Sequence, residues 1–573
     1  MPGRSEQRDH ERPSDYPALP TPAGSHVAPD GYGWTMAHGT PAQEDLLARL
    51  TSSQREAVTA PEPRLAVLAG AGAGKTRVLT LRVARMVDDG IDPRTILVVT
   101  FSRKAAQELR DRLWRLGVEG VRAGTFHRTA LDLLETRRAQ DGDGPPKLLT
   151  DRRRSLRRLL EETPGIPTSA AAGIDTEISW AKGRGVEPDD YEHAVMGQHR
   201  RPTLAPHHVA AVFARYEQGR RRAGMLDFDD LIIEAAAALD DDRFAAAIHW
   251  RTRHLLVDEF QDVSPLQFEL VSRLTTTEST LFLVGDPNQS IYGFNGADPR
   301  LLANIEDLYP TLRVISLGDN HRSTPEIVRA AAAVLPPRDQ RPTVASQAPG
   351  RPPMVVELAD DPAEAAFVAR RILELHAPGG RWRSFAVLAR TNAQLGIIGT
   401  ALEHVGIPTT TLAPDLAAAS DLDPKPQRRP GGAGPPLDAV ALGTFHRSKG
   451  LEWPFVFVIG CSDGFVPHGA ASTGAQADEE RRLLYVALTR AEQELTVTWA
   501  ARRDGEERAA SPPRRRSPFL EPMCRELDQM EHAVRPTSRA SGAQRAAALR
   551  ATVLAAMERR GKVDDGDEGV ECE

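Results

Sequence analysis

Residues 69–76 read Ala-Gly-Ala-Gly-Ala-Gly-Lys-Thr, and this stretch decides the fold around it. An apolar run at residues 65–68 precedes the stretch, and residues 77–84 follow it with helical spacing of their apolar side chains. A strand, a glycine-rich loop and a helix in this order form a phosphate cradle, because backbone N–H groups and the helix N-terminus attract anions. We expect Lys75 to reach the β- and γ-phosphates of a nucleotide and the Thr76 hydroxyl to hold Mg²⁺.

The composition is that of a multidomain globular protein. The chain has 573 residues, too many for one core, with 40% apolar and 26% charged residues. It contains no apolar run of the roughly 18 residues that a membrane span needs. Its three cysteines suit neither a disulfide framework nor a zinc site, so we expect a cytoplasmic protein. The net charge of −7 does not exclude a nucleic-acid partner, because a local basic groove is sufficient to bind one.

Apolar runs alternate with helical segments along the chain and predict an α/β fold with parallel sheets. One set of runs occupies residues 65–68, 96–100, 255–257, 281–284 and 314–317, and a second set occupies residues 354–357, 385–389, 440–444, 455–459 and 495–499. Between His127 and Asp227 the strand signals disappear, and Arg, Leu and Ala recur at helical spacing. This stretch is therefore expected to be a helical insertion.

Two acidic residues, Asp258 and Glu259, follow the apolar run at residues 255–257. Acidic side chains at the carboxyl end of a strand lie where ligands bind in open α/β sheets. Asp258 is placed to hold Mg²⁺, and Glu259 to polarise the water that attacks a phosphate. An acidic pair alone is a weak signal, but together with the loop at residues 69–76 it predicts a site for phosphoryl transfer.

Further motifs occur in the order typical of one family of helicases. Residues 258–262, Asp-Glu-Phe-Gln-Asp, with Pro-Leu-Gln at 265–267, resemble motif II of the UvrD/PcrA/Rep helicases of superfamily 1A. The other motifs follow at residues 50–58 (Q motif), 100–106 (Ia), 124–127 (Ib), 284–294 (III), 320–324 (IV), 444–453 (V) and 479–491 (VI). The resemblance spans roughly residues 43–520, and such an ordered set is far more specific than any single motif.

The resemblance implies an ATP-dependent DNA motor in which two RecA-like α/β domains close around ATP and Mg²⁺. It implies catalytic roles for Lys75, Glu259, Gln289 as the sensor of the γ-phosphate, and Arg322 and Arg490 as arginine fingers. It implies nucleotide contacts from Gln54, Ala69, Gly70, Ala71, Gly72, Ala73, Gly74, Lys75, Thr76, Arg77, His321 and Glu452, with Thr76 and Asp258 as metal ligands. His321 stands where family members often carry Tyr, so we expect weaker stacking on adenine.

Single-stranded DNA and tailed duplex DNA are the partners that the resemblance implies. The expected contacts are Phe101, Thr125, His127, Tyr292, Phe294, Thr444 and His446. Stacking of aromatic side chains on bases is tolerant of sequence and contributes about 1–3 kcal/mol per base, which suits a motor. Family members often carry Trp-Arg where this chain has Phe294-Asn295, so we expect a weaker grip on DNA.

A domain map follows from the motifs and the composition between them. Family members insert a helical 2B domain before motif V, whereas this chain has only residues 413–436, which are too polar and Pro-rich to bury a core. The expected map is a disordered leader (1–42), a RecA-like domain 1A (43–127 and 226–318), a helical 1B insertion (128–225), a RecA-like domain 2A (319–412 and 437–523), a linker in place of 2B (413–436) and a flexible tail (524–573).

Three functions are compatible with these motifs. The first is a 3′-to-5′ DNA helicase that works with repair or replication proteins. The second is a single-strand translocase that displaces proteins and unwinds little, because 2B is absent. The third is a subunit that uses ATP as a switch within a larger complex. The full set of catalytic residues argues against an inactive scaffold.

Overall fold

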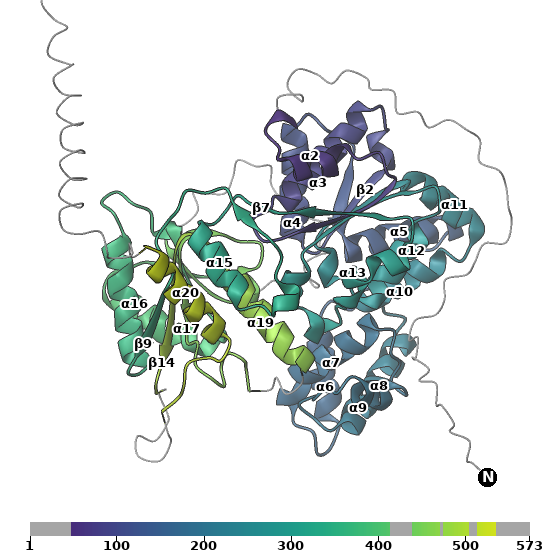
Figure 1. Ribbon diagram of the computed structural model, residues 1–573. Coiled ribbons are helices and arrows are strands. Elements are labelled where there is room, and N and C mark those ends of the chain that lie inside the picture. Colours follow the sequence, from purple (N-terminus) through teal and green to yellow (C-terminus); the bar gives the residue numbers. More distant parts are fainter. Residues whose placement is uncertain (1–46, 413–437, 470–473, 503–512, 535–573) are drawn as a thin grey trace, which may run out of the picture. The chain divides into compact units, whose positions relative to one another are not determined.

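The computed structural model describes residues 47–412, 438–469, 474–502 and 513–534 (Figure 1). The leader expected at residues 1–42 and the linker expected at residues 413–436 lie outside the described residues, as does most of the expected tail.

The first sheet has six parallel strands in the order β3-β2-β4-β5-β1-β6. Val67 of β1 is in register with Val284 of β5 and Ile315 of β6. The phosphate loop follows β1 and the acidic pair follows β4, so both leave the sheet at its carboxyl edge. The strands are β1 (Arg64–Ala69), β2 (Ile96–Thr100), β3 (Arg122–Thr125), β4 (His254–Val257), β5 (Thr280–Gly285) and β6 (Arg313–Leu317).

Helices cover both faces of the first sheet, which explains why its central strands are continuous apolar runs. Leu65 and Val67 pack on one face and Ala66 on the other, because alternate side chains of a strand point to opposite sides. The first face carries α2 (Ser52–Thr59), α3 (Lys75–Asp88) and α4 (Arg103–Arg115). The second face carries α5 (Phe126–Asp141), α10 (Phe228–Ala238), α11 (Asp242–Arg251), α12 (Pro265–Leu274), α13 (Arg300–Ala303) and α14 (Ile305–Leu308).

A group of helices is inserted between α5 and α10 (Figure 1). It consists of α6 (Arg152–Glu161), α7 (Ala171–Gly183), α8 (Tyr191–Gly197) and α9 (Pro206–Arg222). These helices have their own core, in which the side chains of Trp180, Tyr191 and Phe213 are fully buried. The expected loss of strands in this stretch is confirmed.

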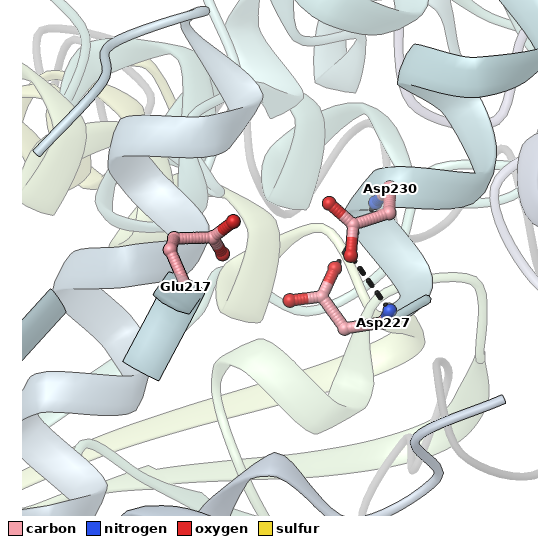
Figure 2. A group of neighbouring side chains, drawn as sticks. All are labelled: Glu217, Asp227 and Asp230. Carbon is pink, nitrogen blue, oxygen red and sulfur yellow. Dashed lines mark hydrogen bonds between the residues drawn. The ribbon is translucent and has the colours of Figure 1, made fainter. Parts of the chain in front are cut away.

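A buried group of charges joins this insertion to α10. The carboxylates of Glu217, Asp227 and Asp230 face one another (Figure 2), and the Nζ atom of Lys182 donates hydrogen bonds to them at 3.1, 2.9 and 2.6 Å. Burial opposes the charge of Lys182, but the three carboxylates together raise its pKa above the ordinary value. We call these four residues the Lys182 cluster. Because the chain's own ammonium group occupies its centre, the three carboxylates are not a metal site.

The second sheet also has six parallel strands, in the order β11-β12-β10-β13-β14-β9. They are β9 (Met354–Leu358), β10 (Phe385–Ala389), β11 (Thr409–Thr411), β12 (Val440–Thr444), β13 (Trp453–Ile459) and β14 (Ala491–Ala500). One face packs against α15 (Pro325–Ala333), α19 (Gly474–Leu488) and α20 (Leu520–Val534), and the other against α16 (Asp361–Leu375) and α17 (Asn392–His404). A small parallel pair, β7 (Asp319–Asn320) and β8 (Val344–Ala345), precedes this sheet. The predicted α/β class with two parallel sheets is confirmed.

The expected start of the tail at residue 524 is wrong. Helix α20 continues to Val534, and Met523 and Met530 are buried in the core of the second sheet. Charged residues on the other side of this amphipathic helix made the segment look like part of a polar tail. Within the described parts of the chain, no helix is both long and apolar enough to cross a membrane.

Candidate nucleotide and DNA site

The phosphate loop connects β1 to the N-terminus of α3. Gly72 and Gly74 have φ angles of 72° and 82°, in the left-handed region that glycine adopts readily. Gly74 is the N-cap of α3 and has no side chain to cap the helix, so the first N–H groups of α3 are left for an anion. Lys75 lies in the first turn, and its Nζ atom is 3.3 Å from the carbonyl oxygen of Ala69, so the ammonium group is held over the loop.

Gln54 on α2 supports the loop from behind. Its Nε2 atom donates to the Ala73 carbonyl at 3.0 Å, and its Oε1 atom accepts from the Thr51 N–H at 3.3 Å. The side chain is buried, so in this structure the amide holds the phosphate loop in place. Arg77 lies two residues after Lys75 on α3 and donates to the Arg49 carbonyl at 3.4 Å. The expected contacts of Gln54 and Arg77 with the nucleotide stay predictions.

The segment that begins with β7 passes directly over the phosphate loop. Asn320 Nδ2 donates to the Ala71 carbonyl at 2.8 Å, and the His321 N–H donates to the Gly72 carbonyl at 2.9 Å. A Cβ atom on Gly72 would lie 2.8 Å from Cβ of Arg322, so the close approach requires glycine. His321 and Arg322 are thus brought to the loop, and the buried Nε2 atom of His321 has no hydrogen-bond partner among the described residues.

Asp258 and Glu259 form a coupled acidic pair at the end of β4. Burial and the neighbouring Glu259 raise the pKa of Asp258 to about 7, whereas Lys75 and Lys449 outweigh burial and lower the pKa of Glu259. Glu259 therefore carries the negative charge and can accept a proton. A divalent cation would favour ionised Asp258, and the hydroxyl of Thr76 is a second oxygen donor, so these side chains fit Mg²⁺.

A chain of hydrogen bonds leads from Glu259 to the second α/β unit. Gln261 Nε2 donates to Glu259 at 2.5 Å, and Gln261 Oε1 accepts from the Asp286 N–H at 2.9 Å. Asp286 in turn accepts from Gln289 Nε2 at 2.6 Å. Arg490 Nη2 completes the chain by donating to Gln289 Oε1 at 3.4 Å.

Arg322 and Arg490, which both follow the last strand of the first sheet in sequence, lie close to this chain of hydrogen bonds. Arg322 donates to Glu452 at 2.6 Å and to the Thr489 carbonyl at 3.3 Å, which places Glu452, one of the expected nucleotide contacts, beside the site. Arg490 is 1% exposed, and burial, followed by the charge of Arg322, lowers its pKa to about 9. Two guanidinium groups so arranged would be stabilised by a polyanion such as a triphosphate.

Four of the expected DNA contacts lie together, and we call them the aromatic cluster. Phe101 stacks on Tyr292 at 4.9 Å between ring centroids, and Phe294 meets His446 edge-on at 5.5 Å. Phe294 is 42% exposed, so its ring offers a face on which a base can stack. Lys449 Nζ lies 5.1 Å from the Tyr292 ring. Burial lowers the pKa of His446 to about 4, so this imidazole is neutral at neutral pH.

The other three expected DNA contacts have different surroundings. Thr125 caps α5 by accepting from the Arg128 N–H at 3.2 Å. His127 packs edge-on against Phe228 at 6.0 Å, and burial lowers its pKa. Thr444 is the buried last residue of β12. Their roles toward DNA stay predictions.

Sequence reasoning assigned no role to several residues that connect the two α/β units. Lys449 pairs with the buried carboxylate of Asp262, and Arg482 Nε donates to the Ser290 carbonyl at 2.9 Å. Both pairs join segments that are far apart in sequence. The signal that could have pointed to them is that all four residues lie inside the motif stretches.

Comparisons with known proteins agree with the geometry. The chain matches the UvrD/REP helicase N-terminal domain over residues 50–310 and the UvrD-like helicase C-terminal domain over residues 315–414 and 432–502. It is 33% identical to the ATP-dependent DNA helicase UvrD2 of Mycobacterium tuberculosis, over 83% of this chain and 82% of that protein. It is 30% identical to the ATP-dependent DNA helicase PcrA of Staphylococcus aureus, over 64% of this chain and 51% of that protein.

Proposed function

Because this chain belongs to the UvrD/REP family of ATP-dependent DNA helicases, we propose that it moves 3′ to 5′ along single-stranded DNA and unwinds tailed duplexes in repair or replication. The observation that carries the proposal is the 3.4 Å contact between Arg490, which follows α19, and Gln289, which follows β5. It supports a nucleotide bound to the phosphate loop that touches both α/β units at once. Hydrolysis can then be coupled to their relative movement.

Each residue of the site has a proposed task in hydrolysis. Lys75 and the N-terminus of α3 bind the phosphates, and Glu259 accepts a proton from the attacking water that Gln289 orients. Arg322 and Arg490 neutralise the charge that develops during phosphoryl transfer. Mg²⁺ held by Thr76 and Asp258 would add to this neutralisation when bound.

The segment from Gln289 to Phe294 has a second proposed task, because it carries two members of the aromatic cluster. Tyr292 and Phe294 follow Gln289 by three and five positions, so a change at the γ-phosphate reaches the stacking residues over a short length of chain. Alternating closed and open states would let the protein grip and release bases in turn. Such stacking needs no particular sequence, as a translocating motor requires.

A pair of assays tests the proposal. The ATPase rate should rise sharply with single-stranded DNA, because DNA favours the closed state in which the arginines reach the phosphate. Strand displacement should require a 3′ tail; displacement from a 5′ tail alone would contradict the polarity. An ATPase rate that DNA does not change would favour the switch subunit.

A second candidate is a translocase that displaces proteins with little unwinding. It is favoured by the short polar stretch at residues 413–436, where the resemblance implies a whole 2B domain. DNA-stimulated ATPase and removal of a protein block, without displacement of a duplex, would support this candidate over the helicase.

A further inference from the structure

The segment that links the nucleotide site to the aromatic cluster is held by side chains of the second α/β unit. Lys449 Nζ donates to the Gln289 carbonyl at 2.7 Å. Farther along the segment, the carboxylate of Glu479 on α19 accepts a hydrogen bond from the Gly293 N–H at 2.9 Å. The hydrolysis proposed above uses Gln289 but leaves Glu479 without a task.

The fit between Glu479 and Gly293 is close. A Cβ atom on Gly293 would lie 2.7 Å from Oε2 of Glu479, nearer than atoms normally approach. Gly293 does not have a positive φ angle, so its backbone conformation does not require glycine. The carboxylate that lies against its Cα is therefore the feature that requires glycine here. Burial raises the pKa of Glu479, and the charge of Arg482 together with the N–H groups of Gly293 and Phe294 opposes that rise.

The helical insertion holds the same loop from another side. Arg200 Nη2 donates to the Phe294 carbonyl at 2.9 Å, and Gly296 lies close to the backbone of Gly183. The Gly293 N–H is thus held by α19, while the Phe294 carbonyl is held by the insertion. Movement of α19 away from the loop would release one of the two supports.

Helix α19 also leads to the nucleotide site. It ends at Leu488, two residues before Arg490, and the stretch from Glu479 to Leu488 is a rigid rod about 13 Å long. The rod therefore carries Glu479 to the DNA-stacking loop, and its other end leads after two residues to Arg490, which contacts the γ-phosphate sensor Gln289. A shift of this rod changes both contacts together.

We infer that Glu479 is a positioning residue that sets the Phe294 ring for base stacking only when α19 is docked for hydrolysis. The inference rests on the proposed function and deepens it, because it names the contact through which the nucleotide state reaches the DNA. Glu479 touches neither the nucleotide nor a base in this scheme. It acts through the backbone of Gly293 and Phe294.

The main test compares Glu479→Ala with the unaltered protein in single-strand-stimulated ATPase. Loss of a charge-assisted hydrogen bond should raise the DNA concentration for half-maximal stimulation about tenfold. The maximal stimulated rate should fall less. Glu479→Gln keeps an amide oxygen that can accept from the Gly293 N–H, so it should recover much of the loss.

A spectroscopic measurement reports the stacking itself. An oligonucleotide with 2-aminopurine loses fluorescence when the base stacks on an aromatic ring. At saturating protein and with a non-hydrolysable ATP analogue, Glu479→Ala should show weaker quenching than the unaltered protein. Equal quenching together with an unchanged half-maximal DNA concentration would overturn the inference.

Gly293→Ala supplies a second, independent variant. Its added methyl group should push the Glu479 carboxylate away, so it should resemble Glu479→Ala, and the two changes should not add in the double variant. Additive effects would show that Glu479 does not act through Gly293. Both single variants are first checked for unaltered thermal unfolding.

Asp478→Ala is the matched control on the same helix. Asp478 pairs with Arg338 at 2.6 Å and makes no hydrogen bond to the Gly293 loop. It should leave the half-maximal DNA concentration unchanged; an effect equal to that of Glu479→Ala would contradict the inference. If the unaltered protein itself shows no DNA stimulation, the proposed function fails, whatever Glu479 does.

Discussion

Lys182 and Arg490 are both buried cations, but the chain surrounds them differently. Lys182 donates to three carboxylates, and its pKa is raised. Arg490 donates to neutral oxygens, among them those of Val486, Leu451 and Gln289, and its pKa is lowered to about 9. Lys182 is satisfied by its own chain, whereas Arg490 is held in position without sufficient negative charge around it.

The difference separates a structural cation from a functional one. A buried charge with carboxylate partners fixes the arrangement of the elements that supply them. A buried charge with only neutral partners is costly until an anion arrives, so its position indicates where that anion binds. On this basis the Lys182 cluster holds the helical insertion on α10, and we expect Arg490 to mark the phosphate site.

The largest expected effect comes from Lys75→Ala. Hydrolysis should fall on the order of 10⁴-fold, equivalent to about 5.5 kcal/mol, because the phosphates lose the cation of the loop. The measurement is steady-state ATPase with saturating single-stranded DNA. Glu259→Gln is the companion variant: it should still bind ATP and DNA but not turn over, and near-normal turnover would remove Glu259 from the mechanism.

Lys182→Met should give the next largest effect, and on stability rather than on turnover. It removes the ammonium that Glu217, Asp227 and Asp230 share and leaves them only the guanidinium groups of Arg152 and Arg220, so the free energy of unfolding should drop by about 3 kcal/mol. Urea titration measures the drop. Adding Asp230→Asn should restore part of it, since one buried charge is removed. A loss of ATPase activity with unchanged stability would break the contrast between the two cations.

Phe294→Ala tests the aromatic cluster and should have an effect of intermediate size. Affinity for single-stranded DNA should weaken by about 1–3 kcal/mol, the contribution of one stacked base. Translocation should slow more than DNA-free hydrolysis does. Stopped-flow dissociation from a labelled DNA end measures the translocation rate, and a steady-state ATPase assay measures hydrolysis. Equal loss of both activities would place Phe294 in the core instead.

The smallest expected effect is that of pH on DNA binding. Burial lowers the pKa of His446 to about 4, so this imidazole gains no proton between pH 8 and pH 6. Affinity for single-stranded DNA should therefore not rise over this range at constant salt. A rise that disappears in His446→Gln would show that His446 binds DNA as a cation.

The sequence was sufficient where chemistry is local. The glycine loop before α3 and the acidic pair after β4 occupy consecutive residues, so their spacing alone predicts their position at one edge of a sheet. The continuous apolar strands likewise predict a sheet that is covered on both faces. Short edge strands were missed, because β3 and β11 lack an apolar run that distinguishes them from loops.

Contacts between distant segments could not be predicted from one sequence. Lys182 meets Asp227 across 45 positions, and Glu479 meets Gly293 across 186 positions, with no periodicity that relates them. Lys182 stands in an ordinary helical pattern, and only the folded chain shows that its side chain is surrounded by carboxylates. Which charges are paired within the chain, and which await a ligand, is therefore a property of the tertiary structure.

Glu259 has φ and ψ angles of 52° and 41°, a left-handed backbone conformation that is unfavourable for residues with a Cβ atom. Such a conformation costs on the order of 1 kcal/mol relative to glycine, which adopts it without strain. A search for more heat-resistant variants would therefore favour glycine at this position. The same search would remove the proposed base that activates water, so we expect thermal selection and catalytic selection to oppose each other at this residue.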